Sequence, residues 1–348
     1  MSAFEKFSGS GPIRVVQVGC GGMAQGWVER SIKKPGLQVV GLVDIRRQAA
    51  EDTAKKFNLP ASVVYDSLGD ALKQAKPDAV FDITIPGAHY AVTTEALRAG
   101  CHVLGEKPLS DTLPHAREMC KLAAETKRLY MVTQNRRHAG NIIAFSNAVK
   151  NNVIGQLSTL DADFFIGAHF GGFRDAMDNV LIVDMAIHTF DQARLISGAD
   201  PVSVYCHEFN PHGSWYKGNA AAICIYEMTN GIVFTYRGSW AAAGFNTSWE
   251  STWRAVGVNG SIIWDGASDP KAQVVCGDQG FTRPVKDVPI PSQPLEFSQH
   301  EGVLEEFIQC VKSGKTPQTV CTDNIKSLAM CLASVESAKT GKKVKVEW

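Results

Sequence analysis

The sequence has no excess of charge of either sign. Thirty-five Lys and Arg residues balance thirty-five Asp and Glu residues, so the formal net charge of the 348-residue chain is zero at pH 7. Proteins that bind nucleic acid or anionic membranes through their overall field carry a basic surplus or a basic stripe. The balance therefore argues against both kinds of partner.

The sequence also lacks a C-x-x-C pair, although it contains nine cysteines. Their odd number and wide scatter argue against a disulfide framework, which typically shows an even set at close spacing. We therefore expect reduced thiols that are mostly buried.

No stretch approaches the roughly 18 consecutive apolar residues that a membrane helix needs. The first ten residues contain no apolar signal region. We expect no membrane partner and a cytoplasmic location. The remaining composition, 45% hydrophobic and 20% charged, is that of an ordinary globular protein, and the length predicts two domains.

Short apolar runs alternate with amphipathic segments in the first part of the chain. The strand-like runs are residues 13–19, 37–44, 62–65, 79–84, 102–104 and 130–133. The helix-like segments between them include residues 48–57, 68–75, 90–98 and 115–127. This alternation predicts a Rossmann-type doubly wound α/β domain, a parallel sheet with helices on both faces, over residues 1–135.

The rhythm changes after about residue 135. Asn230-Gly231 and Asn259-Gly260 each separate two apolar runs, which predicts type I′ hairpins because both central residues of that turn have positive φ. Helical patterns cover residues 142–150, 181–196, 301–312 and 325–339, and a short strand follows at 344–346. The pattern predicts an α+β domain over residues 136–348 with a large, mostly antiparallel open sheet, whose C-terminal helices could pack back on the first domain.

The turn after the first strand is typical of a dinucleotide site. It reads Gly19-Cys-Gly21-Gly22-Met23-Ala24, a G-x-G-x-x-A in which glycines allow a tight turn and a close approach of pyrophosphate. A strand precedes it, a helical segment follows it, and Asp44 ends the second strand twenty residues after Ala24. A simple glycine turn is the alternative interpretation.

The same segment favours NAD over NADP. Asp44 should accept hydrogen bonds from the adenosine ribose and repel a 2′-phosphate. Arg46 and Arg47 follow it, and either guanidinium could neutralise that phosphate. NAD is therefore the predicted cofactor, and NADP stays open.

Other polar residues follow the later strands, where ligands of such sheets bind. They include Pro86 and His89, Glu106-Lys107-Pro108, and Asn135-Arg136-Arg137. Taken singly, such residues are often simply solvated.

Asp184 and His188 lie four apart in a helical segment, which predicts one shared face. A carboxylate there could orient an imidazole for proton transfer, or the pair could be a surface hydrogen bond. Two such ligands could also hold zinc, but no H-E-x-x-H or cysteine cluster completes the set, so we predict no metal.

Together these residues resemble the Gfo/Idh/MocA oxidoreductase family, which includes glucose–fructose oxidoreductase and inositol dehydrogenase. The resemblance covers nearly the whole chain, and the Glu-Lys-Pro and Asp-x-x-x-His motifs are more specific than the glycines. It is carried by the glycine turn, Thr84-x-Pro86-x-x-His89, residues 99–108, residues 135–137, Asp184-x-x-x-His188, Glu306-Phe307 and residues 337–341. One departure is Asp178-Asn179-Val180, where the family often carries a glycine cluster.

The resemblance implies a two-domain subunit whose open sheet forms a homodimer or homotetramer. It implies Lys107, Asp184 and His188 as the catalytic set, with Glu106 and Pro108 shaping the cofactor side. The residues that we expect at the cofactor are Gly19, Gly21, Gly22, Met23, Ala24, Asp44, Ile45, Arg46, Thr84, Pro86, His89, Glu106, Lys107 and Arg137.

In the mechanism that this implies, a substrate hydroxyl lies between Lys107 and His188. His188 removes its proton as hydride leaves, Lys107 stabilises the developing oxyanion, and Asp184 orients His188. Arg174, Asn179 and Trp215 join these three as expected substrate-binding residues. Weaker candidates for the pocket wall are Phe170, His212 and Tyr216, since such aromatics are more often core or interface residues.

The expected function is an NAD(P)-dependent dehydrogenase of a sugar, sugar derivative or cyclitol. Two alternatives stay open, a glycosidase of the same family that retains NAD and a non-catalytic dinucleotide-binding regulator.

Overall fold

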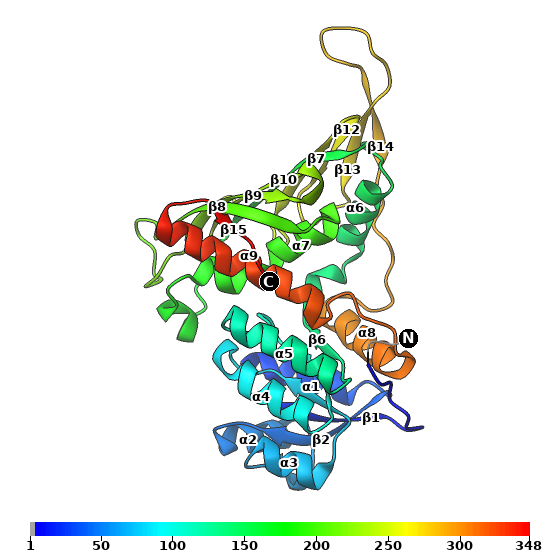
Figure 1. Ribbon diagram of the computed structural model, residues 1–348, viewed down its shortest axis with the longest axis vertical. Coiled ribbons are helices and arrows are strands. Elements are labelled where there is room, and N and C mark those ends of the chain that lie inside the picture. The colour runs from blue at the N-terminus through cyan, green and yellow to red at the C-terminus, as the bar shows by residue number, and fades with distance from the viewer. Residues whose placement is uncertain (1–3) are drawn as a thin grey trace. The chain divides into compact units, whose positions relative to one another are not determined.

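The computed structural model describes residues 4–348, and the chain divides into two compact units (Figure 1). The first unit comprises the described residues up to Gln134 together with His300–Ile325. The second comprises Asn135–Gln299 and Lys326–Trp348. The division into a domain of residues 1–135 and a domain of residues 136–348 stays a prediction.

The first unit is built on a six-stranded parallel sheet in the order β3-β2-β1-β4-β5-β6. Its buried strands read as continuous apolar runs, as expected where helices cover both faces. The strands are β1 (Ile13–Val18), β2 (Leu37–Val43), β3 (Val64–Tyr65), β4 (Ala79–Asp82), β5 (His102–Gly105) and β6 (Tyr130–Val132).

Helices alternate with these strands, and one comes from the C-terminal part of the chain. The crossover helices are α1 (Gly22–Ile32), α2 (Arg47–Lys56), α3 (Leu68–Ala75), α4 (Pro86–Arg98) and α5 (Leu113–Glu125), with a 3₁₀ turn at η1 (Ala61–Val63). Helix α8 (Gln299–Ser313) packs on the same sheet, where Phe307 meets Phe81 edge to face at 5.5 Å. Burial of these apolar side chains is the main stabilising contribution here.

The second unit is built on a nine-stranded sheet in the order β14-β13-β12-β11-β7-β10-β9-β8-β15. Neighbouring strands are antiparallel except β7 and β10, which pair in parallel. The strands are β7 (Leu157–Phe165), β8 (Pro201–Phe209), β9 (Ala221–Met228), β10 (Val233–Ser239), β11 (Thr252–Gly257), β12 (Gly260–Trp264), β13 (Lys271–Val275), β14 (Val285–Pro289) and β15 (Val344–Lys345).

One face of this sheet is covered by helices. Phe190 of α7 packs against Tyr226 at 5.1 Å and Tyr236 at 5.3 Å, and the Tyr226 hydroxyl donates to the Met330 carbonyl of α9. The elements here are η2 (Asn135–Arg137), α6 (Gly140–Lys150), η3 (Gly172–Ala176), η4 (Leu181–Ala186), α7 (Ile187–Ser197), η5 (Thr229–Gly231) and α9 (Cys321–Thr340).

The other face carries no helix within residues 135–299 and 326–348 (Figure 1). Alternate side chains of β8 and β9 are exposed there, as the period of two requires. The predicted fold class, a parallel Rossmann sheet followed by a mostly antiparallel open sheet, is confirmed.

The two predicted hairpins form, but only one uses the predicted turn. Asn230 and Gly231 have φ of 63° and 70° between β9 and β10, as a type I′ turn requires. Asn259 and Gly260 have negative φ, so the prediction of a type I′ turn there is wrong. Gly260 is already part of β12, and a Cβ on it would lie 2.2 Å from the Gln273 carbonyl oxygen, so close strand packing explains this glycine.

The helix predicted over residues 181–196 begins with a π-helical segment. Residues Leu181–Ala186 form η4, and the regular α-helix starts only at Ile187. The wider turn changes the phase between Asp184 and His188, so their spacing is not that of a regular α-helical pair. Such π segments occur frequently at functional sites.

All nine cysteines are free thiols, and eight of them are buried, as expected. No helix among residues 4–348 is both long and apolar enough to span a membrane.

Candidate active site

The glycine turn after β1 leaves room for a ligand. Gly19 has φ of +96°, and a Cβ on it would lie 2.3 Å from the Ile83 carbonyl oxygen, so this position requires glycine. A Cβ on Gly21 or Gly22 would meet nothing within 4 Å, so the start of α1 is open. Exposed amides at a helix N-terminus bind phosphate.

Gln17 supports this turn and was not predicted from the sequence. Its buried side-chain amide donates at 3.0 Å to the carbonyl oxygens of both Gly19 and Ala24. A polar residue inside the apolar run of β1 was the available signal.

Asp44 is fixed at the end of β2 by backbone donors. Its carboxylate accepts hydrogen bonds from the amides of Cys20 and Arg46, both at 2.8 Å. Arg46 is 73% exposed and 3.8 Å from the carboxylate, whereas Arg47 is bonded to Glu51 and Asp66. Ile45, which follows Asp44, and Met23, at the start of α1, both have exposed apolar side chains.

The turn after β4 is organised by a buried carboxylate, Asp82. It accepts hydrogen bonds from the hydroxyls of Thr84 at 2.6 Å and Thr93 at 3.0 Å, and it lies 3.0 Å from His89 Nδ1. Burial alone would lower the pKa of His89, but the carboxylates of Asp82, Glu106 and Asp111 together outweigh it, so the pKa is raised above its usual value. Pro86 is the first residue of α4.

His89 is 1% exposed, so the structure places it beneath this turn rather than on its surface. Its contacts are those of a side chain that shapes the turn.

Glu106 fixes the turn that carries Lys107. Its buried carboxylate accepts a hydrogen bond from the Trp27 indole at 2.9 Å through one oxygen and from the Lys107 backbone amide at 3.0 Å through the other. Lys107 is partly exposed at the carboxyl end of β5, and its peptide bond to Pro108 is cis. Trp27 was not predicted, because nothing local in α1 indicates a partner 79 residues away.

In the second unit, the structure brings together two of the predicted residues, Arg174 and Asp184. The Arg174 Nε donates to Asp184 Oδ2 at 2.6 Å, and its Nη2 lies 3.5 Å from Oδ1. Asp184 is buried, and Arg174 is its cationic partner. His188 is partly exposed in the first turn of α7.

Asn179 is bonded to Glu208, which the sequence analysis missed. Glu208 Oε2 accepts hydrogen bonds from the side-chain amides of Asn179 at 2.6 Å and Asn219 at 3.4 Å. Burial raises the pKa of Glu208 to about 7, although both amides act to lower it. These bonds tie β8 to the segment that leads into η4.

Aromatic rings surround the segment that follows β7. Trp215 stacks on His169 with 3.5 Å between ring centroids, and its indole donates to the Ala168 carbonyl at 3.1 Å. The Tyr216 hydroxyl donates to the same carbonyl at 2.5 Å. Trp240 and Trp249 extend this cluster and were not predicted, whereas the predicted His212 is simply exposed.

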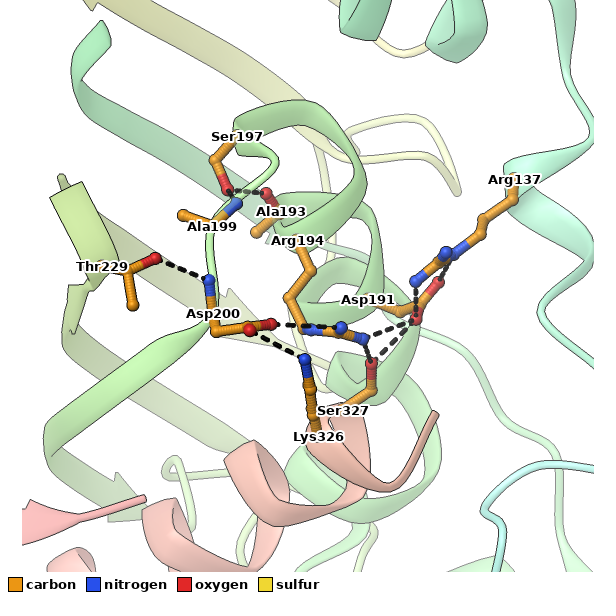
Figure 2. Close-up of polar contacts among 10 residues, drawn as sticks. All are labelled: Arg137, Asp191, Ala193, Arg194, Ser197, Ala199, Asp200, Thr229, Lys326 and Ser327. Carbon is orange, nitrogen blue, oxygen red and sulfur yellow. Dashed lines mark hydrogen bonds and ion pairs between the residues drawn. The ribbon is translucent and has the colours of Figure 1, made fainter. Parts of the chain in front are cut away.

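Arg137, expected at the cofactor, is buried in a network within the second unit (Figure 2). Its guanidinium binds Asp191 of α7 through bonds of 2.6 Å and 2.7 Å. Ser327 of α9 donates to the same carboxylate at 2.8 Å, and Arg194 donates to Ser327. The network fastens the helix of His188 to α9 and η2.

Among residues 4–348 no group of three or more His, Cys, Asp or Glu side chains is arranged to hold a metal ion.

Comparison with known proteins identifies both halves of the chain. Residues 13–134 match a family model described as an oxidoreductase family with an NAD-binding Rossmann fold. Residues 142–263 match the model of the GFO/IDH/MocA C-terminal domain.

Curated relatives include sugar oxidoreductases. The 1,5-anhydro-D-fructose reductase of Ensifer adhaerens is 24% identical over 337 residues, which cover 95% of this chain and 97% of that protein. The D-glucoside 3-dehydrogenase of Escherichia coli (strain K12) is 30% identical over 213 residues, 59% of this chain and 60% of that protein.

Among solved structures, an oxidoreductase from Agrobacterium radiobacter in complex with NAD+, L-tartaric acid and magnesium has the same fold. Its TM-score is 0.84 at 20% identity, and the match covers 96% of this chain and 98% of that one.

Proposed function

The chain belongs to the Gfo/Idh/MocA oxidoreductase family and carries its NAD-binding Rossmann fold, and from this premise we propose that it is a dehydrogenase of polyhydroxylated ring compounds. In this proposal, it transfers a hydride between a ring carbon that bears a hydroxyl and nicotinamide. The substrate class is a sugar, a sugar derivative or a cyclitol, in line with the sugar-related names of two relatives.

The observation that carries the proposal is the turn after β5. Lys107 follows a strand of an NAD-binding sheet at its carboxyl end, where ligands of such sheets bind. Glu106 holds the Lys107 backbone and is itself held by the buried Trp27. A preorganised cation at this position suits the stabilisation of a developing oxyanion.

The residues of the first unit fit NAD. The open Gly21 and Gly22 at the start of α1 would hold the pyrophosphate, and Asp44 would accept from the adenosine ribose. Met23, Ala24, Ile45, Thr84 and Pro86 would line the same groove. When bound, NAD supplies the hydride acceptor. We propose NAD over NADP because the anchored Asp44 carboxylate repels a 2′-phosphate.

We assign the proton chemistry to His188. It would take the substrate hydroxyl proton, and Lys107 would stabilise the oxygen as negative charge develops. Arg174 binds Asp184, and this carboxylate, four residues before His188 in the sequence, would favour the imidazolium that forms. Arg174, Asn179 and Trp215 would help to hold the substrate.

The test is absorbance of reduced nicotinamide with purified protein, NAD or NADP, and a panel of cyclitols, aldoses, glycosides and sugar acids. We expect turnover with one substrate class and a faster rate with NAD. Lys107→Ala and His188→Ala should each lower kcat by orders of magnitude while NAD affinity stays nearly unchanged. Lys121→Ala, an exposed lysine of α5, should leave kcat unchanged.

Two outcomes would contradict the proposal. Substantial turnover by either variant would remove the role assignments. If no compound of the panel gave reduced nicotinamide, and NAD co-purified with the protein without exchanging, an NAD-retaining glycosidase or a non-catalytic regulator would be favoured.

We also propose that the helix-free face of the nine-stranded sheet joins copies of the chain into a homodimer or homotetramer. Val202, Tyr205, Phe209, Ile223 and Ile225 are each 39–48% exposed on β8 and β9. Apolar side chains gathered on one face mark an interaction surface more often than isolated ones do.

A reducing compartment such as the cytoplasm would suit the nine free thiols.

A further inference from the structure

The second unit exposes three aromatic side chains on a single surface. Phe170 and Phe173 lie in the segment after β7 and are each 50% exposed, and Trp249 lies before β11 and is 46% exposed. The rings of Phe170 and Trp249 meet edge to face at 6.0 Å, so two distant segments of the chain form one aromatic patch. The aromatic patch comprises Phe170, Phe173 and Trp249.

Phe170 of the aromatic patch packs on buried aromatic rings. Phe170 packs on the buried Trp240 at 5.2 Å, and Trp240 stacks on Tyr216 at 5.9 Å with nearly parallel rings. An exposed side chain that contacts only water does not require buried aromatic rings beneath it. The arrangement resembles the apolar wall of a ligand site.

Arg174 connects the patch to the proposed reaction site. Its guanidinium lies over the Phe170 ring at 5.2 Å and over the Phe173 ring at 4.7 Å. The same guanidinium donates to Asp184 at 2.6 Å. The patch is therefore one residue away from a carboxylate of the proposed catalytic set.

A polyol without an apolar substituent would bury little of the apolar area of such a surface. One face of a pyranose can cover one aromatic ring with its C–H groups, but its hydroxyls need polar partners. An apolar planar group would instead bury the exposed edges of several rings at once and would gain the corresponding free energy.

We propose that the aromatic patch binds a planar apolar group attached to the substrate, so that the substrate is a glycoside with an aromatic aglycone rather than a free sugar or cyclitol. This inference rests on the proposed dehydrogenase function. Arg174 would set the distance between the aglycone and the ring that reacts, because it contacts both the patch and Asp184.

The experiment compares kcat/KM for methyl and phenyl glycosides that share one sugar ring, namely the α- and β-D-glucosides, galactosides and xylosides, with NAD. We expect the phenyl member of the preferred pair to be favoured by about tenfold or more, the effect of burying one aromatic ring. Phe170→Ala and Phe173→Ala should reduce this preference severalfold each. Circular dichroism and urea midpoints close to those of the natural protein should show that both variants are folded.

The matched control is Phe281→Ala. Phe281 is fully exposed and belongs to the loop that projects beyond β13 and β14 (Figure 1), so the preference should be unchanged. Equal kcat/KM for methyl and phenyl glycosides, or oxidation of free polyols but of no glycoside, would overturn the inference and leave the dehydrogenase proposal standing. No oxidation of any polyol or glycoside would overturn both.

A loss of oligomers in Phe170→Ala and Phe173→Ala, without any change in substrate preference, would identify the patch as a contact with a second copy and would equally overturn the inference. The oligomeric state is measured on the same samples by light scattering.

Discussion

At the scale of single residues, carboxylates at the ends of the strands organise the turns of the first unit. Asp44 and Asp82 fix the ends of β2 and β4, and Glu106 fixes the end of β5. Each accepts a hydrogen bond from a backbone amide or a hydroxyl, and this bond fixes the position of the side chain relative to its turn. Substitution at such a position therefore changes the shape of a turn as well as its charge.

Cofactor choice is expected to depend on Asp44. Asp44→Asn removes the charge that repels a 2′-phosphate, and the exposed Arg46 remains next to it. We expect the ratio of kcat/KM for NADP to that for NAD to rise by about tenfold or more, equivalent to about 1.4 kcal/mol. The double variant Asp44→Asn/Arg46→Ala should lose most of the gain with NADP. An unchanged ratio in Asp44→Asn would show that another residue reads the ribose.

Glu208 is expected to make stability depend on pH. Its pKa is about 7 in the folded protein against an ordinary value of 4.5, so between these values the folded state holds the proton more tightly than the unfolded chain. Its contribution is complete below the lower value and is lost as pH rises towards 7. Glu208→Gln removes this loss, so the variant should gain stability relative to the natural protein between pH 5 and pH 8.

The measurement is the urea midpoint of both proteins at these two pH values. His89, whose pKa is also raised, is present in both proteins and cancels in the difference. A difference between the midpoints that does not change with pH would mean that Glu208 keeps its ordinary pKa.

At the scale of elements, the sequence was most informative where one local rule decides the structure. Apolar runs located every strand of the first sheet, and Asn230-Gly231 located a hairpin because both residues tolerate positive φ. It was less informative where a partner comes from elsewhere in the chain. Arg174 lies in a short 3₁₀ segment without periodicity, so its bond to Asp184 could not be foreseen.

The sequence pattern of β8 could have predicted that Glu208 is a partly buried acid. Val204, Cys206 and Glu208 alternate along β8 and share its inner face, so a carboxylate in this series predicts a buried acid with polar partners. The identity of those partners, Asn179 and Asn219, depends on the packing of three segments and is not encoded locally.

The helix of His188 is expected to depend on the buried Arg137–Asp191 pair (Figure 2). Asp191→Ala leaves a buried guanidinium without its carboxylate and should lower the free energy of unfolding by about 3–5 kcal/mol. The matched control is Asp163→Ala, since Asp163 binds the exposed Arg237 with similar bidentate geometry. There we expect a loss of only about 0–1 kcal/mol. Chemical denaturation measures both, and equal losses would contradict the burial argument.

At the scale of the whole molecule, a chain with no net charge has little long-range repulsion between its copies. Self-association is then decided by surface complementarity. The exposed residues of β8 and β9 lie in register across the pair, with Tyr205 opposite Ile225 and His207 opposite Ile223. A sheet face with exposed apolar side chains suits a two-fold contact, in which the same residues meet from both copies.

We therefore expect Ile225→Glu to separate the copies. Ile225 is 48% exposed, so the variant should fold, but a contact across the two-fold axis would bring buried carboxylates together without partners. Light scattering should give a multiple of 37.7 kDa for the natural protein and a mass near 37.7 kDa for the variant. Ile32→Glu, at an isoleucine of α1 that is 40% exposed, is the matched control and should keep the natural mass. If Ile225→Glu stayed associated, or if the natural protein were already a monomer at micromolar concentration, the face would have to serve another purpose, and the exposed apolar side chains of β8 and β9 would need a different partner.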